Sequence, residues 1–175
     1  MAYPLAAVRG LVAGIAGTAV MTAYQLAVAK ARGQRLGTPV PRTWAEAPAP
    51  ARVAKKATEL VGKPRAITKK DVPRVTNAMH WGYGVGWGIV YGVAAHALRP
   101  HPAAGAVGFG VGLWGLQYAE LVPLGISQPP WEYPLEELGL DLSYHLVYGA
   151  GVLVINLLVD VALALLDPRS VIREG

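Results

Sequence analysis

The sequence predicts an all-α membrane protein, a four-helix transmembrane bundle that forms a single integral membrane domain over residues 1–175. Three observations carry this prediction: four long apolar stretches without lysine or arginine, positive charge concentrated in one loop, and glycines spaced four residues apart inside the apolar stretches. Roughly 20 residues, rising ~1.5 Å each along a helix, cross a hydrocarbon core of ~30 Å. Each stretch is therefore long enough to span a bilayer.

The four predicted spans are residues 11–29, 77–98, 103–121 and 142–166. The first could instead be a signal peptide, because Arg9 precedes it. That apolar run is long for a signal core, however, and it ends in Lys30 and Arg32 rather than in a small-residue cleavage site. Burial of all four stretches in a water-soluble core is the other alternative, and the scarcity of charge between them argues against it.

Glycine alternates with larger residues in the stretch HWGYGVGWGIVYG, residues 80–92, which raises the question of a β-strand. A membrane barrel needs many strands of ~10 residues, whereas the first and last stretches are continuous apolar runs of helix length. On a helix, the glycines make smooth seams that let transmembrane backbones approach closely. The predicted seams are Gly84 with Gly88 and Gly92, Gly82 with Gly86, Gly10 with Gly14, and Gly108 with Gly112.

A dinucleotide-binding pattern, G-x-G-x-x-G, is present at Gly110, Gly112 and Gly115. This fingerprint requires a preceding strand and a helix that begins at its glycines. Here it lies within a predicted hydrophobic helix, so we do not expect nucleotide binding.

Residues 30–76 form a basic loop that holds 12 of the 16 lysines and arginines but only three acidic residues. Trp44 is its only aromatic residue, so it lacks the stacking platforms of a single-strand nucleic-acid binder, and we expect no nucleic-acid partner. The charge bias predicts a cytoplasmic loop against anionic lipid headgroups, in a multi-pass protein of the bacterial inner membrane with both termini outside. Within the loop, residues 51–61 have the pattern of an interfacial helix.

Two further connections complete the predicted topology. Residues 99–102 form a tight hairpin that makes the second and third spans antiparallel neighbours. Residues 122–141 contain four prolines and form a proline-rich cap on the same side as the basic loop, and Pro134 followed by two glutamates is typical of the start of a short helix.

This antiparallel order brings polar side chains from all four spans to the face that carries the cap. His80, Glu120 and His145 are expected within ~5 Å of one another in depth. The face also includes Gln25, Tyr118 and Tyr144. A hydrogen-bonded network that orients the helices is the simplest interpretation; a metal, proton, headgroup or small-ligand site and bis-histidine haem ligation by His80 and His145 stay open as alternatives.

Asp160 lies about two turns inside the end of the last span, where an unpaired carboxylate is strongly disfavoured. His96, near the corresponding end of the second span, is the predicted partner, and Asn156, one turn before Asp160, is expected to complete the group. A structural role for this group is favoured over transport.

A family resemblance covers roughly residues 76–150. It rests on the sequence from Met79 and His80 through Tyr91, on Pro123-Leu124-Gly125, Pro129-Pro130, Pro134 and Glu137, and on His145-Leu146-Val147. In these features the chain resembles the YagU-like family of bacterial inner-membrane proteins. The resemblance implies a polytopic membrane protein and no defined activity. Relatives have a histidine where this chain has Ala119-Glu120, which weakens any metal site implied by the resemblance.

The leading functional prediction is a non-enzymatic accessory subunit or scaffold of a membrane assembly, either as a homo-oligomer or within a larger complex, without a cofactor. The alternative is a ligand, metal or proton-handling site formed by His80, Glu120 and His145. Membrane-embedded catalysis lacks a candidate nucleophile or a carboxylate pair. The chain has no cysteine, which excludes disulfides and thiolate metal sites.

Overall fold

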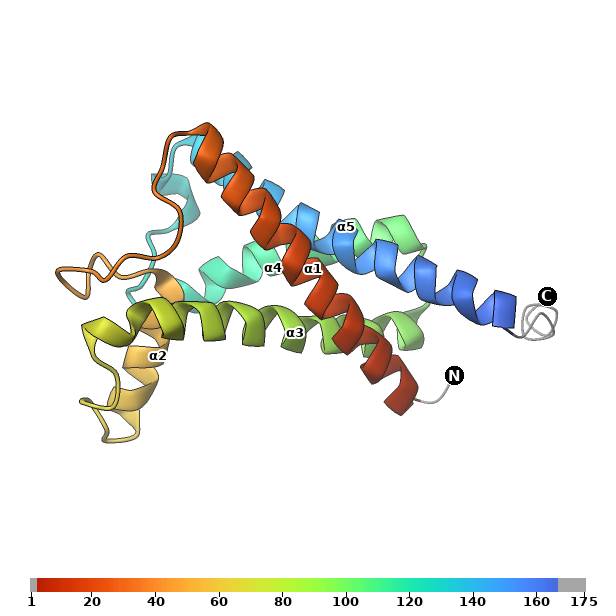
Figure 1. Ribbon diagram of the computed structural model, residues 1–175, viewed down its shortest axis with the longest axis horizontal. Helices are drawn as coiled ribbons and strands as arrows, with labels where there is room; N and C mark the ends of the chain where they lie inside the picture. The colour runs from red at the N-terminus through yellow and green to blue at the C-terminus, as the bar shows by residue number, and fades with distance from the viewer. Residues whose placement is uncertain (1–2, 167–175) are drawn as a thin grey trace.

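The computed structural model describes residues 3–166, and these residues form helices and connecting loops without any strand (Figure 1). The all-α prediction is confirmed. The elements are α1 (Tyr3–Ala31), α2 (Ala49–Leu60), the 3-10 turn η1 (Lys69–Asp71), α3 (Val72–Leu98), α4 (Pro102–Leu121), the 3-10 turn η2 (Pro130–Glu132) and α5 (Leu135–Leu166).

The outer helices extend beyond the predicted spans. α1 begins at Tyr3 rather than at residue 11, and α5 begins at Leu135 rather than at residue 142. The first turn that was predicted after Pro134 is thus the start of α5 and not a separate short helix, so the proline-rich cap ends at Pro134. Two glutamates in this turn favour a helix N-terminus, and no proline interrupts the helix between residues 135 and 142.

Two helices among the described residues, Tyr3–Ala31 and Leu135–Ala162, are long and apolar enough to cross a membrane. α3 and α4 do not pass the same test. Neither has a lysine or arginine within its predicted span, but both are rich in glycine, tyrosine and tryptophan, which contribute little hydropathy. The prediction of four spanning helices therefore meets this test for α1 and α5 alone.

The helices pack in the order α3, α1, α5, α4, and α1 crosses both α3 and α5 (Figure 1). As predicted from the tight connection at residues 99–102, α3 and α4 run antiparallel (Figure 1), and they are neighbours through their side chains. These two helices make little direct backbone contact. Aromatic rings lie between them instead: the rings of Tyr91 and Phe109 are 4.8 Å apart, and those of Trp87 and Phe109 are 6.5 Å apart.

Glycines bring α1 and α3 into backbone contact. A Cβ atom added at Gly88 would lie 2.6 Å from the Gly10 carbonyl oxygen and 2.7 Å from the Gly14 nitrogen, and one added at Gly92 would lie 2.7 Å from Gly10 Cα. Real Cβ atoms essentially never come this close to a backbone. Only glycine fits here, and the seam that includes Gly84 joins these two helices.

A second seam joins α4 to α5 through Gly110 and Gly149, rather than through the predicted pair Gly108 and Gly112. A Cβ atom at Gly110 would lie 2.7 Å from the His145 carbonyl oxygen. In contrast, nothing lies within 4 Å of the positions where Gly108 and Gly112 would carry one. The predicted second seam of α3, Gly82 with Gly86, likewise faces open space. The four-residue spacing was therefore right for α1 with α3, but it selected the wrong face of α4.

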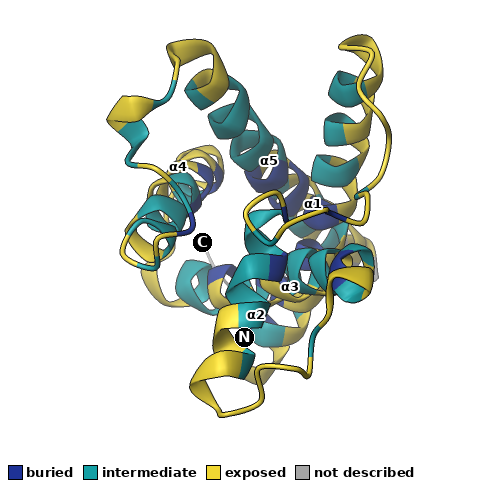
Figure 2. Cartoon of the chain, turned by 90° about the vertical axis from the view of Figure 1, so that its left-hand side faces the viewer, coloured by how far each residue is buried: buried dark blue, intermediate teal, exposed yellow. Residues whose placement is uncertain are grey.

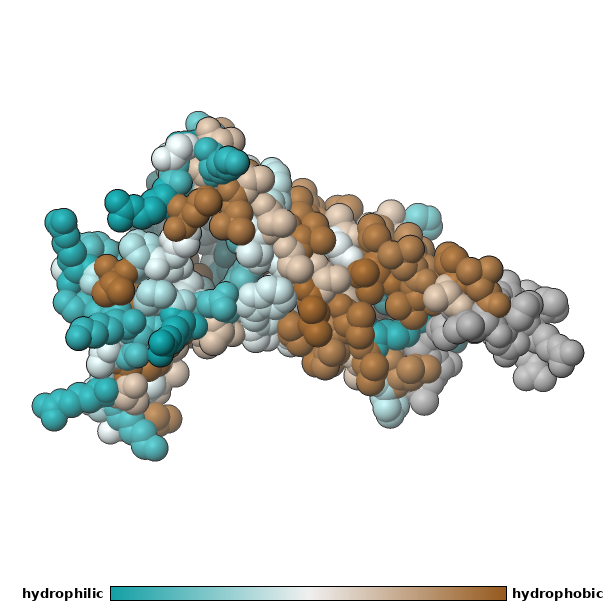
Figure 3. Space-filling view, viewed as in Figure 1, coloured by the Kyte–Doolittle hydropathy of each residue, from teal (hydrophilic) through white to brown (hydrophobic). Residues whose placement is uncertain are grey.

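In α1, small residues face the neighbouring helices, and most branched apolar side chains face away from them. The buried residues of α1 are Ala6, Gly10, Ala13, Gly14, Gly17 and Thr18, whereas its leucines, valines and isoleucine are exposed to a large extent. In the long helices, the buried residues gather where the helices cross (Figure 2), and a smaller buried cluster lies at Ala47, Ala51 and Val72. On the face shown in Figure 3, apolar surface covers most of the half of the molecule that lies away from the basic loop, and the end with the basic loop is mostly hydrophilic.

The basic loop contains α2, which lies against the N-terminal end of α3. Ala51 of α2 and Val72 of α3 are fully buried together. Arg52 donates hydrogen bonds to the carbonyl oxygens of Ile126 and Gly125, at 2.7 and 3.0 Å. A helix is therefore present over Ala49–Leu60, where the sequence predicts one over residues 51–61, and part of its charge binds the cap rather than facing outward.

Candidate functional site

A cavity of about 260 Å³ opens at the end of the molecule that carries the cap and the basic loop. α1, α3, α4 and α5 form its walls, and residues of α2 cover it. His80, Glu120, His145 and Gln25, which the sequence predicts at one level, all line this polar chamber. The space exists because α3 and α4 do not close on each other, as shown by the packing order above.

The two carboxylates of the polar chamber accept hydrogen bonds from neutral donors. Glu120 accepts one from the Tyr83 hydroxyl, at 3.2 Å. Asp141, on the first turns of α5, accepts one from the Tyr118 hydroxyl at 3.1 Å and another from the Gln117 side chain. Three ion pairs are found within residues 3–166, and neither carboxylate takes part in one of them.

The hydrogen bonds of the two imidazoles determine which ring nitrogen carries the proton. His145 Nδ1 lies 2.9 Å from the Asp141 carbonyl oxygen, which is only an acceptor, so Nδ1 must donate. Thr22 uses its hydroxyl proton to bond the Thr18 carbonyl oxygen at 2.7 Å, so His80 Nε2 donates to the Thr22 oxygen at 3.0 Å. In the neutral rings, Nε2 of His145 and Nδ1 of His80 therefore carry the free lone pairs.

Two residues predicted for the cluster lie beside the polar chamber rather than in it. Tyr118 supports Asp141 through its hydroxyl group, as described above. The Tyr144 ring packs edge-on against Tyr24, with the ring centroids 5.6 Å apart. Among residues 3–166, no group of three histidine, cysteine, aspartate or glutamate side chains is arranged to hold a metal ion.

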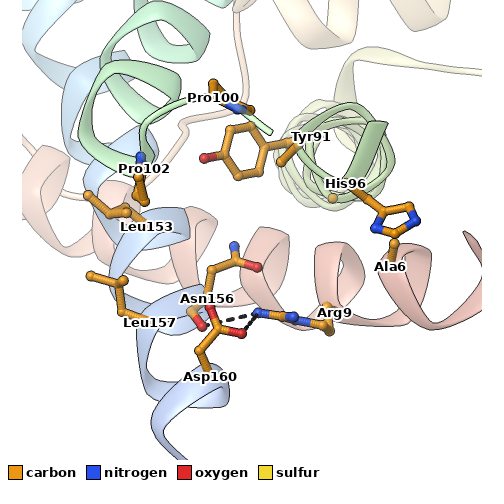
Figure 4. A pocket seen from close by; sticks show the side chains of 12 residues that line it. Ala6, Arg9, Tyr91, His96, Pro100, Pro102, Leu153, Asn156, Leu157 and Asp160 are labelled. Atoms are coloured by element: carbon orange, nitrogen blue, oxygen red, sulfur yellow. Dashed lines mark hydrogen bonds and ion pairs between the residues drawn. The ribbon is translucent and has the colours of Figure 1, made fainter. Parts of the chain in front are cut away.

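The other end of the molecule holds a second cavity, of about 210 Å³, which contains the Asp160 side chain (Figure 4). Here Arg9 of α1 reaches α5 and forms an ion pair with Asp160, with the nitrogen and oxygen 2.5 Å apart. The guanidinium also donates to the Asn156 carbonyl oxygen, at 3.3 Å. The Arg9 side chain is 14% exposed and that of Asp160 is 58% exposed, so the pair lies at the rim of the bundle.

The predicted pairing of Asp160 with His96 is wrong. The His96 ring is turned away from Asp160 (Figure 4) and packs edge-on against the Tyr3 ring, with the centroids 5.0 Å apart. Asn156 contributes its backbone carbonyl oxygen to the group, while its side chain donates to the Val152 carbonyl oxygen. Arg9 places a fixed positive charge beside the Asp160 carboxylate, and this charge stabilises the carboxylate more strongly than a neutral imidazole would.

Sequence reasoning missed Arg9 and Asp141 because both lie just outside the predicted helix ends. Arg9 precedes residue 11 and was treated as a loop charge; Asp141 precedes residue 142 and was assigned to the cap. Extending each helix by two turns places Arg9 on the face of α1 that meets α5, and places Asp141 one turn before His145. Polar residues beside an apolar run would have been the signal for both.

Comparisons of the chain with protein families, with curated proteins and with solved structures find no match. The resemblance to the YagU-like family therefore stays a prediction based on the residues given above.

Proposed function

We propose that the chain is a multi-pass protein of the bacterial inner membrane in which α1, α3, α4 and α5 all span the bilayer. The support for this is the distribution of side chains: glycine and alanine are buried at the crossings, while many leucines, isoleucines and valines are exposed, with Leu113 and Val152 among the buried exceptions. A water-soluble bundle of this size buries its large apolar side chains. The 20 residues of α4 provide about 30 Å of helix, which matches the hydrocarbon core.

The same proposal places the basic loop and the polar chamber in the cytoplasm, because lysine and arginine are retained on that side. The chain contains no cysteine, so single-cysteine variants can test this directly. We expect an impermeant maleimide added to intact spheroplasts to label His101→Cys, in the connection between α3 and α4. Lys63→Cys, in the basic loop, should react only after the membrane is permeabilised. Equal labelling of both variants in intact spheroplasts would contradict the four-span topology.

Within the membrane, the proposed role is that of a non-catalytic accessory subunit or scaffold. One observation carries this role: two glycine pairs spaced by four, Gly82 with Gly86 and Gly108 with Gly112, are exposed, and a Cβ atom added at any of them would meet nothing within 4 Å among the described residues. Helices in lipid associate through such small-residue surfaces, because lipid provides no hydrophobic drive. The glycines that hold the chain together are different residues, so these pairs remain available to a second copy or to another membrane protein.

The assembly is tested by Gly108→Leu and Gly112→Leu. Neither side chain would meet an atom within 4 Å of its Cβ, so the fold should be kept while the outward surface is blocked. Ala103→Leu is the matched control, because it is also exposed on α4 but lies about 140° around the helix from Gly108. We expect crosslinking in native membranes to capture a complex for wild type and for the control, and little complex for the two glycine variants. Failure to capture any complex for wild type would refute the role.

A second candidate function, the binding of a ligand, is favoured by the existence of the polar chamber itself. Ligand sites are concave and mostly apolar, with a few polar groups that converge on one point. The polar chamber has this composition, with Met21, Met79 and Leu113 among its apolar residues.

A further inference from the structure

We propose that the polar chamber binds an organic ammonium ion that carries a small apolar group. This inference deepens the second candidate function and does not depend on the assembly role. It rests on the charge of the polar chamber, on the spacing of its acceptors and on its aromatic wall.

The charge argument begins with the two carboxylates. Glu120 lies at the exposed edge of the polar chamber and Asp141 lies partly buried on its α5 side. Within the described part of the chain, neither forms an ion pair, and every hydrogen bond found for them comes from a neutral hydroxyl or amide. Negative charge next to a cavity without a protein cation attracts a cationic guest.

The nearest basic helix does not supply that cation. Lys56 of α2 donates to the Leu124 carbonyl oxygen at 2.7 Å, and Arg52 donates to the carbonyl oxygens of Gly125 and Ile126. Both side chains thus hold α2 across the cap and above the polar chamber. They close it without neutralising its carboxylates.

The spacing of the acceptors favours an organic cation over a metal ion. A metal needs three or more donor atoms about 2–2.5 Å away, and the structure brings no such group together among residues 3–166. An ammonium group with an attached hydrocarbon reaches acceptors that are farther apart. Besides the carboxylates, the lone pairs on His80 Nδ1 and His145 Nε2 are acceptors for its N–H groups.

The remaining walls suit the rest of such a guest. Tyr83 and Tyr148 line the polar chamber, and an aromatic face attracts a cation. The volume of about 260 Å³ equals that of roughly nine water molecules in the liquid, which is enough for a short alkylammonium ion. The source of the ammonium is either a free amine or the headgroup of an aminophospholipid, since both present the same chemistry.

The test uses hexylammonium chloride, with hexanol and sodium hexanoate as neutral and anionic probes of the same chain length. With the full-length protein in a mild nonionic detergent at constant ionic strength, calorimetry should detect binding of hexylammonium alone. Glu120→Gln keeps the oxygen that accepts from Tyr83 but removes the charge, and it should weaken binding at least tenfold. Glu132→Gln, in η2 and outside the polar chamber, is the control and should bind as wild type does. Asp141→Asn is the second variant and should also weaken hexylammonium binding at least tenfold. An unchanged melting temperature shows that this variant keeps its fold.

A lipid arm separates the two sources. Native mass spectrometry of protein released from nanodiscs of phosphatidylethanolamine and phosphatidylglycerol should show retained phosphatidylethanolamine, lost in Glu120→Gln, if the headgroup is the guest. Hexylammonium binding without retained lipid identifies a free amine. Equal binding of hexylammonium and hexanol, or unchanged binding in Glu120→Gln, would overturn the proposal. Crosslinking of the assembly is measured separately, so either proposal can fail without the other.

Discussion

The seam between α1 and α3 makes Gly88→Ala the sharpest test of the packing. The added methyl group would lie 2.6 Å from the Gly10 carbonyl oxygen and 2.7 Å from the Gly14 nitrogen, and closer still to Gly14 Cα. Carbon atoms in ordinary contact stay about 3.5–4.0 Å apart, so the two helices would have to separate by about 1 Å. Backbone atoms cannot turn aside as a side chain can, and the separation therefore loosens the whole seam.

The expected cost is that of overpacking, about 1–3 kcal/mol of unfolding free energy. For a chain of this length, that corresponds to a melting temperature lower by about 2–12 °C. Gly86→Ala is the matched control on the same helix, because its methyl group meets nothing within 4 Å. Alanine is the better helix former by up to about 1 kcal/mol, so this variant should be as stable as wild type or slightly more stable.

The measurement is thermal unfolding of the two variants and wild type in the same detergent, followed by circular dichroism. A second-site variant makes the test specific. A Cβ atom at Gly84 would overlap the Thr18 hydroxyl oxygen, and Thr18→Ala removes that oxygen. Gly84→Ala should therefore be less destabilising in the Thr18→Ala background than alone. If Gly88→Ala melts with wild type while Gly86→Ala is destabilised, the described seam is on the wrong face of α3 and the reasoning fails.

Three further predictions concern the ends of the helices. In a double-mutant cycle of Arg9→Gln with Asp160→Asn, the coupling free energy from chemical unfolding should be only ~0.5–1 kcal/mol, because the carboxylate is 58% exposed; a value near 3 kcal/mol would mean a buried pair. The side-chain and backbone hydrogen bonds of Thr68 hold the pKa of Asp71 below its ordinary value. This carboxylate therefore stabilises the start of α3 at a pH above its unfolded pKa, and the contribution is lost as the pH falls through the folded pKa. Thr68→Ala should raise the pKa of Asp71 in an NMR titration, and an unchanged pKa would contradict this. Arg99 ends α3 with a φ of 46°, so Arg99→Gly should raise the stability by about 1 kcal/mol in the same unfolding assay, whereas Arg99→Ala, which keeps the left-handed strain, should not.

The sequence predicted the helices more reliably than their partners. Continuous apolar runs and glycine spacing were sufficient for the four long helices, because both depend on local pattern. The distance between α3 and α4 was not predicted, since a short connection fixes direction but not distance. Gly108 and Gly110 lie on different faces of one helix, and the spacing rule fits Gly108 with Gly112 without indicating which face meets α5.

The candidate site was predicted in part for the same reason. Counting the rise per residue placed His80, Glu120 and His145 at one level, and all three line the polar chamber. Depth along a helix follows from sequence position alone. Lateral partners do not, which is why Asp160 was assigned to His96, at a similar depth, rather than to Arg9. Helix ends were set too short by hydropathy, and this excluded Arg9 and Asp141 from consideration.

The position of the polar chamber follows from where the glycines lie. Gly88 draws α3 onto α1, Gly17 lies at the crossing of α1 with α5, and Gly110 draws α4 onto α5. These contacts form an open chain of four helices and leave α3 and α4 as its two free edges. Phe109 and neighbouring aromatic rings fill the gap between those edges toward the middle of the helices, whereas near the cap, among the described residues, only the Tyr83–Glu120 hydrogen bond bridges it and the polar chamber remains. Adding one more glycine seam, between α3 and α4, would close the bundle and abolish the polar chamber, so the absence of that close backbone contact is what leaves the chamber open in this fold.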